Sequence, residues 1–222
     1  VFMGIGIPKD SAYILLGPDT VFNYTREDVA LGTLNGDESM VFCAYDLKAE
    51  NFLWWHRAGT PYLDQFQECL VDSQGDVIFL GYSEGTKFEI NGDTLQSSGW
   101  MEPIMAKYSR DGEFRWAFRT PESIGDRYSK MKVGVDDAIY ITGVHKATEL
   151  QIQDTVLSNP YGSELGRGLL VKYHADGSLD WATQLEGDHQ FSAYTDIAFK
   201  GDDRLLATIS GFEGELIIDG KA

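Results

Sequence analysis

Histidines are the residues most often used for metal binding and acid–base chemistry, and here they form no recognised pattern. His56, His145, His174 and His189 are scattered, without the HxH or HExxH spacing that places two imidazoles on one metal ion. No GxSxG elbow, phosphate-binding loop or GxGxxG after a strand is present. The sequence therefore predicts no catalytic residue, no metal site and no cofactor.

Acidic residues recur in pairs within short polar stretches that follow apolar runs. The pairs are Asp72 with Asp76, Asp136 with Asp137, and Asp202 with Asp203. Their carboxylates could hold calcium, although aspartate in such a stretch is more typical of a turn. The repetition also argues against catalysis, because an active site is normally built once.

The two cysteines, Cys43 and Cys69, lie in strand-like runs and make neither a zinc pattern nor a CxxC pair. Buried thiols are the more common state for such residues, and a disulfide between them stays open as an alternative.

Composition narrows the class of protein. The 222 residues carry a net charge of −17, which disfavours nucleic-acid backbones and anionic membrane surfaces as partners. An aromatic content of 13% and 24 glycines favour strands and tight turns. No apolar run approaches the roughly 18 residues of a membrane span, and the first residues do not read as a signal peptide.

Two landmarks repeat along the chain with one period. Apolar runs ending in glycine finish at Gly17, Gly81, Gly143 and Gly211, with steps of 64, 62 and 68 residues. Trp54, Trp116 and Trp181 follow one another at 62 and 65 residues. KYSRDGEFRWAFRT, from Lys107, returns as KYHADGSLDWATQL, from Lys172. The chain is therefore built from repeats of one structural unit.

Each unit is expected to contain four strands. In the third unit these are KMKVGVD, AIYITGV, GLLVKYH and SLDWATQL, and Asp176-Gly177 is expected to close a two-residue hairpin between the last two. The helix-like run PYLDQFQECL is assigned to a strand because the repeat register requires it. The period exceeds that of common propeller repeats, and the excess lies between the second and third strands, where we expect an added strand or loop.

Tandem four-stranded sheets that are apolar on both faces predict an all-β fold, specifically a segment of a β-propeller with about three and a half blades. The units are approximately residues 1–60, 61–122, 123–187 and 188–222, the last incomplete. Because a propeller must close into a ring of at least four blades, we expect residues 1–222 to be one segment of a longer chain that opens inside the first strand of its first unit.

The pattern KY, DG, W and then IYITG resembles the SBBP-type β-propeller repeats of secreted Bacteroidota proteins over nearly the whole chain. The resemblance implies an extracellular, non-catalytic module of a cell-surface protein, often exported by type IX secretion. The DG…W element is also similar to the tryptophan-docking repeats of quinoprotein-like propellers, although the stricter AxDxxTGxxxW form is not present.

Asp followed by Ser or Thr and an apolar residue resembles the O-glycosylation motif of Bacteroidota surface proteins. It occurs four times where about one is expected by chance, and the hydroxyl residues are Ser11, Thr20, Thr94 and Thr155. The same triplet also favours a turn before a strand, which is the alternative.

Departures from the repeat are the positions at which we look for a binding surface. Trp55 and His56 stand where later units have Ala117 and Phe118, or Ala182 and Thr183, and Trp100 and Tyr161 end the added segments. Exposed aromatics could contact a protein or stack on sugars, whereas packing between blades is the structural alternative.

The sequence thus predicts a non-enzymatic, secreted or cell-surface scaffold or binding module. Its loops are expected to contact a protein partner or other domains of the same chain. A glycan-binding propeller and an enzyme with a central-channel site are the alternatives. No nucleic acid or membrane insertion is expected.

Overall fold

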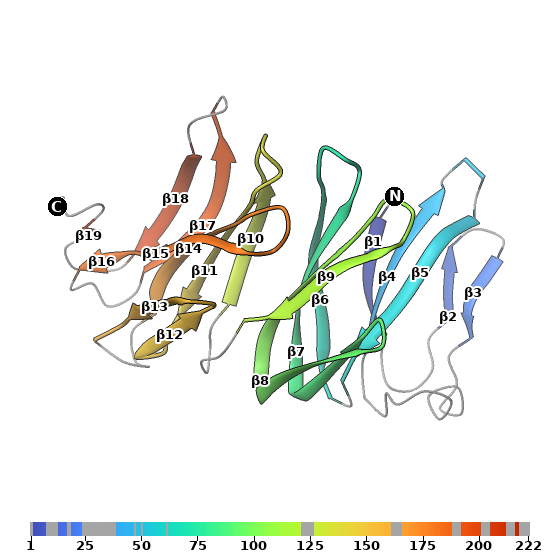
Figure 1. Ribbon diagram of the computed structural model, residues 1–222, viewed down its shortest axis with the longest axis horizontal. Helices are drawn as coiled ribbons and strands as arrows, with labels where there is room; N and C mark the ends of the chain where they lie inside the picture. Colours follow the sequence, from blue (N-terminus) through green and yellow to red (C-terminus); the bar gives the residue numbers. More distant parts are fainter. Residues whose placement is uncertain are drawn as a thin grey trace. The chain divides into compact units, whose positions relative to one another are not determined.

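The computed structural model shows two compact units, Val1–Arg119 and Thr120–Ala222. The structure describes residues 2–7, 13–16, 19–23, 39–46, 48–49, 51–60, 62–120, 127–160, 166–187, 192–200, 205–211 and 216–217. All the elements of secondary structure among these residues are β-strands, which confirms the predicted all-β class (Figure 1). In this part of the chain no helix is long and apolar enough to cross a membrane.

The second half of the first unit is a four-stranded antiparallel meander in the order β6-β7-β8-β9, called the second meander below. Its strands are β6 (Asp64–Val71), β7 (Val77–Ile90), β8 (Asp93–Tyr108) and β9 (Phe114–Arg119). The helix-like run is strand β6, as the repeat register predicted. This run forms a strand because β7 provides hydrogen-bond partners for its backbone along its length.

The first meander has the order β1-β4-β5 and corrects one prediction. Its strands are β1 (Phe2–Ile7), β4 (Ser39–Asp46) and β5 (Asn51–Gly59). The run ending at Gly17 was expected to pair with the third strand, but β4 pairs with β1 instead. Residues Tyr13–Leu16 form β2, which pairs only with β3 (Asp19–Asn23) among the described strands.

The reason for that error is that an apolar run before a glycine suits both a central strand and one arm of a hairpin. The Asp-Thr-apolar triplet is the better landmark, because Thr20, Thr94 and Thr155 all lie at the start of a hairpin's second arm. The prediction that the chain opens inside the first strand of a unit is wrong for the same reason, since β1 takes the second strand's position.

The second unit contains the third meander, in the order β10-β11-β14-β15. Its strands are β10 (Arg127–Val133), β11 (Ile139–His145), β14 (Arg167–Tyr173) and β15 (Leu179–Gln184). These are the four strands that the sequence predicted. A further pair, β17 (Ser192–Phe199) with β18 (Leu205–Gly211), begins the next repeat.

The hairpin turns of the second and third meanders share one geometry. In the turn before β9, the Ser109 N–H donates to Glu113 O at 2.7 Å and the Gly112 N–H donates to Ser109 O at 2.9 Å. The same pattern occurs at Asp72–Asp76, Gly134–Ala138 and His174–Ser178. This is a three-residue loop, a type I turn followed by one left-handed residue, so the predicted two-residue loop is wrong by one residue.

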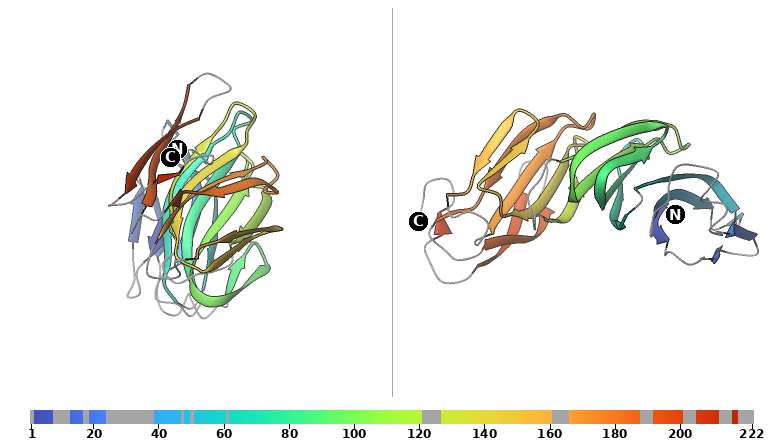
Figure 2. Two further views of the ribbon diagram at one scale, coloured as in Figure 1. Left: turned by 90° about the vertical axis from the view of Figure 1, so that its left-hand side faces the viewer. Right: turned by 90° about the horizontal axis from the view of Figure 1, so that it is seen from below.

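An extra hairpin between the second and third strands accounts for the long period, as predicted; we call it the excursion hairpin. In the second meander it is the far half of β7 and β8, which turns at Asn91-Gly92 and shows as the long green ribbon in Figures 1 and 2. In the third meander it is a separate pair, β12 (Glu149–Ile152) with β13 (Thr155–Ser158).

The excursion segment of the second meander also pairs with the last strand of the first meander. In the first unit Ala58 and Gly59 of β5 pair with Ile90 and Glu89 of β7. In the second unit Glu186–Gly187 (β16) pair with Ile217 and Leu216 of β19 (Leu216–Ile217). The β5–β7 ladder of two residues therefore joins the first and second meanders, whereas β16 and β19 form a separate two-stranded sheet.

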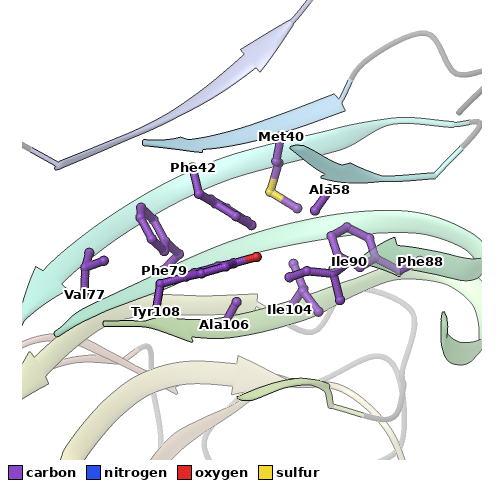
Figure 3. Packing of buried hydrophobic residues seen from close by; sticks show 10 residues of the cluster. All are labelled: Met40, Phe42, Ala58, Val77, Phe79, Phe88, Ile90, Ile104, Ala106 and Tyr108. Atoms are coloured by element: carbon purple, nitrogen blue, oxygen red, sulfur yellow. The ribbon is translucent and has the colours of Figure 1, made fainter. Parts of the chain in front are cut away.

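Face-to-face packing forms the core of each unit. Between the first and second meanders, Phe42 stacks on Phe79 at 4.5 Å between ring centroids, and Tyr108 lies beside both (Figure 3). The ten buried residues of this cluster are Met40, Phe42, Ala58, Val77, Phe79, Phe88, Ile90, Ile104, Ala106 and Tyr108. Each large side chain contributes about 1.5–3 kcal/mol by leaving water.

A smaller cluster holds the second unit together. Leu170, Leu185 and Ile197 are buried between the third meander and β17, and Tyr140 meets Phe199 edge-on at 5.0 Å. In the second meander, alternate residues of β7 are buried on both faces, since Ile78 and Leu80 are as inaccessible as Val77 and Phe79. The sequence predicted sheets that are apolar on both faces, and β7 agrees with that prediction.

Candidate functional site: the outer strand of the first meander

Strand β5 presents two different faces because alternate residues of a strand point to opposite sides. Trp54 and His56 point toward the second meander. The Trp54 Nε1–H donates to Arg110 O at 2.9 Å, and His56 Nε2 lies 2.7 Å from Gly112 O. A carbonyl can only accept, so His56 donates from Nε2. Both side chains thus hold the turn that connects β8 and β9.

Glycine is required in that turn for two reasons. Gly112 has a φ of +88°, where side chains are disfavoured, and a Cβ there would lie 2.6 Å from Trp54 Cγ. In this first pair of sheets, Trp54 of one sheet therefore packs against the Asp-Gly turn of the next.

His56 is consequently a packing residue. Its ring stacks on Tyr108 with 4.7 Å between centroids and an interplanar angle of 14°. Burial raises the pKa of Tyr108 far above that of a free phenol, so this ring remains neutral. The sequence proposed His56 as a binding residue together with Trp55, but the structure places the two on opposite faces of β5.

Trp55 occupies the other face of β5, and half of its surface is exposed (50%). Leu53, two residues earlier on the same face, is exposed to 62%. Trp54, Trp116 and Trp181 stand opposite Ala44, Lys107 and Lys172, so Trp55 is equivalent to Ala117 and Ala182. A large exposed aromatic therefore stands where the other sheets have a methyl group. We call Leu53 and Trp55 the β5 outer patch.

The turn beside this patch also departs from the repeat. Asp46 Oδ1 accepts hydrogen bonds from the N–H groups of Lys48 and Ala49, at 2.8 and 3.0 Å. These bonds lower the pKa of Asp46. Residues 46–51 contain no glycine like Gly112. The first meander therefore lacks the glycine turn against which a tryptophan packs in the second meander.

The other predicted binding residues are not brought to this patch by any described contact. Trp100 lies in β8, with its side chain outside the described part, and Tyr161 lies outside the described residues altogether.

Two of the four hydroxyl residues in glycosylation-like triplets lie on the arms of excursion hairpins with described side chains. Thr94 is exposed and its Oγ1 donates to Glu89 Oε1 at 2.7 Å, while Thr155 is partly exposed in β13. Thr20 lies in β3, with its side chain undescribed, and Ser11 falls outside the described residues.

A repeated lysine contacts one member of each described acidic pair, Asp72 or Asp136, whereas Asp202 and Asp203 lie outside the described residues. Lys107 Nζ lies 2.7 Å from Asp72 Oδ2 in a buried ion pair, with side chains exposed to 7% and 1%. In the next meander Lys172 lies 2.8 Å from Asp180 and 3.6 Å from Asp136. The hydrogen bond from Lys172 lowers the pKa of Asp180, and its acceptance by Asp180 raises the pKa of Lys172. Asp72, Asp136 and Asp180 each contact a lysine, and the described residues contain no cluster of three or more His, Cys, Asp or Glu that could hold a metal ion.

The two cysteines are thiols and do not form a disulfide. Cys69 packs against the core cluster between the first two meanders, whereas Cys43 alternates with Phe42 of that cluster and faces away from it. Burial raises the pKa of the Cys69 thiol, which keeps it protonated.

Sequence reasoning missed a set of buried polar residues where the excursion hairpins leave the meanders. Arg119 forms an ion pair with Glu102 at 3.3 Å, and each side chain is only 2% exposed. Arg119 also donates to Ser83 O and Gly85 O, both at 2.9 Å. Asp64 is buried as well, and its carboxylate accepts from the Thr60 N–H at 2.6 Å. The one sequence signal that could have revealed these residues is that polar side chains occur at equivalent positions of successive units.

Comparison with known proteins adds no family. No protein-family model matches the chain, and no curated protein shows a significant match to it.

Proposed function

We propose that this chain is a non-enzymatic scaffold or binding module that contacts a protein partner through the β5 outer patch. The observation that carries the proposal is Trp55, which is half exposed at a position where the repeat otherwise has alanine. Tryptophan is enriched among the residues that dominate protein interfaces, because its large ring buries much apolar surface at little entropic cost.

The β-propeller is the proposed architecture. It is supported by four-stranded meanders, by the face-to-face core between successive sheets, and by the docking of Trp54 on the next sheet's turn. Such packing yields a rigid platform whose loops and outer strands can vary without loss of the core. A secreted or cell-surface location belongs to the same proposal and rests on the SBBP-type resemblance and the four glycosylation-like triplets.

The alternative function is glycan binding, since an exposed tryptophan ring can also stack on a sugar. The same residue carries this alternative, so binding assays must separate the two. Among the described residues, the buried side chains of Arg119, Glu102 and Asp64 are engaged by partner side chains or by the backbone, so these three do not favour an enzymatic function.

The test compares Trp55→Ala, which restores the repeat residue, with Val71→Ala, a matched change of another exposed apolar side chain. The labelled chain is titrated onto intact cells of its native source and, separately, onto a glycan array. We expect Trp55→Ala to weaken cell binding at least tenfold and Val71→Ala to leave it unchanged. Equal binding by the three proteins contradicts the proposal, and binding to a defined sugar that Trp55→Ala abolishes favours the alternative.

A further inference from the structure

His145, the last residue of β11, is linked through one side chain to the excursion hairpin of its own sheet. Its Nε2 lies 2.7 Å from Gln184 Oε1 on β15. The Gln184 Nε2–H in turn donates to Ser158 O, at the end of β13, over 2.7 Å. Two hydrogen bonds in series therefore join the buried imidazole to the base of the β12–β13 hairpin.

The direction of these bonds decides where the proton on His145 resides. Because the Gln184 amide nitrogen donates to a carbonyl, its oxygen faces His145, and His145 must donate from Nε2. Nδ1 of the neutral ring is then an acceptor, and it is buried without a hydrogen-bond partner among the described residues. A proton added at Nδ1 would find no acceptor in this part of the chain.

Among the described side chains, Arg167 is the charged group that faces this imidazole. It stands opposite His145 in the β11–β14 ladder and is 3% exposed. Burial is the main cause that lowers the pKa of His145, and the charge of Arg167 adds to it, while the bond to Gln184 acts in the opposite direction. A second positive charge is therefore disfavoured while the link is closed.

The first unit builds the same attachment from a permanently charged residue. Ser83, Glu102 and Arg119 take the positions of His145, Arg167 and Gln184, as the two ladders show. Arg119 bonds to the carbonyls of Ser83 and Gly85 at the base of that hairpin and pairs with Glu102. Since guanidinium does not lose its proton near neutral pH, this link does not titrate there.

We propose that His145 makes the base of the β12–β13 hairpin an acid-sensitive contact, which opens below neutral pH while the corresponding hairpin of the first unit stays attached. Water can solvate a protonated imidazole once the Gln184 link opens, so the open form binds the extra proton. The tip of the hairpin keeps its own contacts, because Gln153 bonds to Gly177 O and to the Leu179 N–H.

The sign follows from proton linkage. The open form titrates near the ordinary histidine pKa of about 6.5 and the closed form below it, so between these values the open form holds more protons. Closure is therefore most favoured above about pH 6.5 and weakens as the pH falls, with the opening equilibrium rising by up to about tenfold per pH unit.

Hydrogen exchange of residues 146–160, corrected for the intrinsic pH dependence, tests the proposal between pH 7.5 and 5.5. The variant is His145→Gln, which keeps an N–H donor for Gln184 but does not titrate. The matched control is His174→Gln, a change of an exposed histidine in the same unit. We expect faster opening at pH 5.5 in the native chain and in His174→Gln, no change in His145→Gln, and no change in residues 84–96 of any protein.

An equal acid response in His145→Gln, or none in the native chain, overturns the proposal. Should His145→Gln fail to fold, the native protein is titrated by NMR at the His145 Cε1 proton. An inflection at or above pH 6.5 overturns the proposal, whereas one below it, followed by the hairpin amides, supports it.

Discussion

At the scale of single residues, the repeat is explained by what each recurring side chain touches. Trp54 rests on a turn whose glycine leaves no room for a Cβ, and Lys107 neutralises Asp72 in a buried pair. The residues that break the pattern are correspondingly those with other surroundings: Trp55 faces outward, and His145 is a titratable residue in place of Ser83.

Gly112→Ala should destabilise the first unit far more than Gly92→Ala. Both glycines have left-handed φ values, +88° and +85°, but a Cβ at Gly92 meets nothing within 4 Å whereas at Gly112 it would strike Trp54. We expect about 1 kcal/mol from backbone strain at Gly92, and about 1–3 kcal/mol more at Gly112 from displacement of the ring. Urea unfolding measures both, and equal losses would show that Trp54 shifts without cost.

Lys107→Met tests whether the buried ion pair holds the second meander. The change leaves the Asp72 carboxylate buried without its cation, which costs about 3–5 kcal/mol. The exposed pair of Arg110 and Asp111 is the control, because exposed pairs contribute under about 1 kcal/mol and Arg110→Ala should have little effect.

The double variant Asp72→Asn, Lys107→Met should recover part of the lost stability. Asp72 Oδ1 accepts from the N–H groups of Gln74 and Asp76, and the amide oxygen of an asparagine at this position can accept the same two bonds without a buried charge. A double variant no more stable than Lys107→Met alone would mean that the lysine stem, and not its charge, carries the effect.

At the scale of elements, the excursion hairpin is the feature that distinguishes these sheets from shorter repeats. It lengthens β7 and β8 in one sheet and forms the separate β12–β13 pair in another, and in the first unit its segment pairs with the last strand of the preceding sheet. A hairpin placed at the margin of a sheet also carries exposed residues, which is where Thr94 lies.

Mass spectrometry of the protein from its native source should find glycan mass on Thr94 or Thr155. Thr94 is exposed and Thr155 partly exposed, and both stand beside an aspartate and an apolar residue. Thr142, fully buried in β11, is the internal control that should be bare. Unmodified Thr94, Thr155, Thr20 and Ser11 would remove the main support for the surface-protein proposal other than the resemblance.

At the scale of the whole molecule, the all-β class and the order of the strands in the second and third meanders could be predicted from the sequence. An apolar strand buried on both faces leaves an unbroken hydrophobic run, and a repeated unit shows its boundaries by repetition. These signals are local in the sequence, so they can be recognised without knowledge of the fold. The propeller remains a proposal about how such sheets continue.

The tertiary structure alone decided which strands pair and which faces are covered. The apolar run of residues 12–17 could be either a central strand or one arm of a hairpin. Only the pairing of β1 with β4 shows that β1 takes the position of the second strand. Trp54 and Trp55 are adjacent in the sequence, but the second meander packs against only one side of β5, so Trp54 is a partly buried anchor and Trp55 is half exposed. Burial depends on neighbours distant in sequence, and for this reason neither the role of His56 nor the link from His145 could be predicted from residue types and spacing.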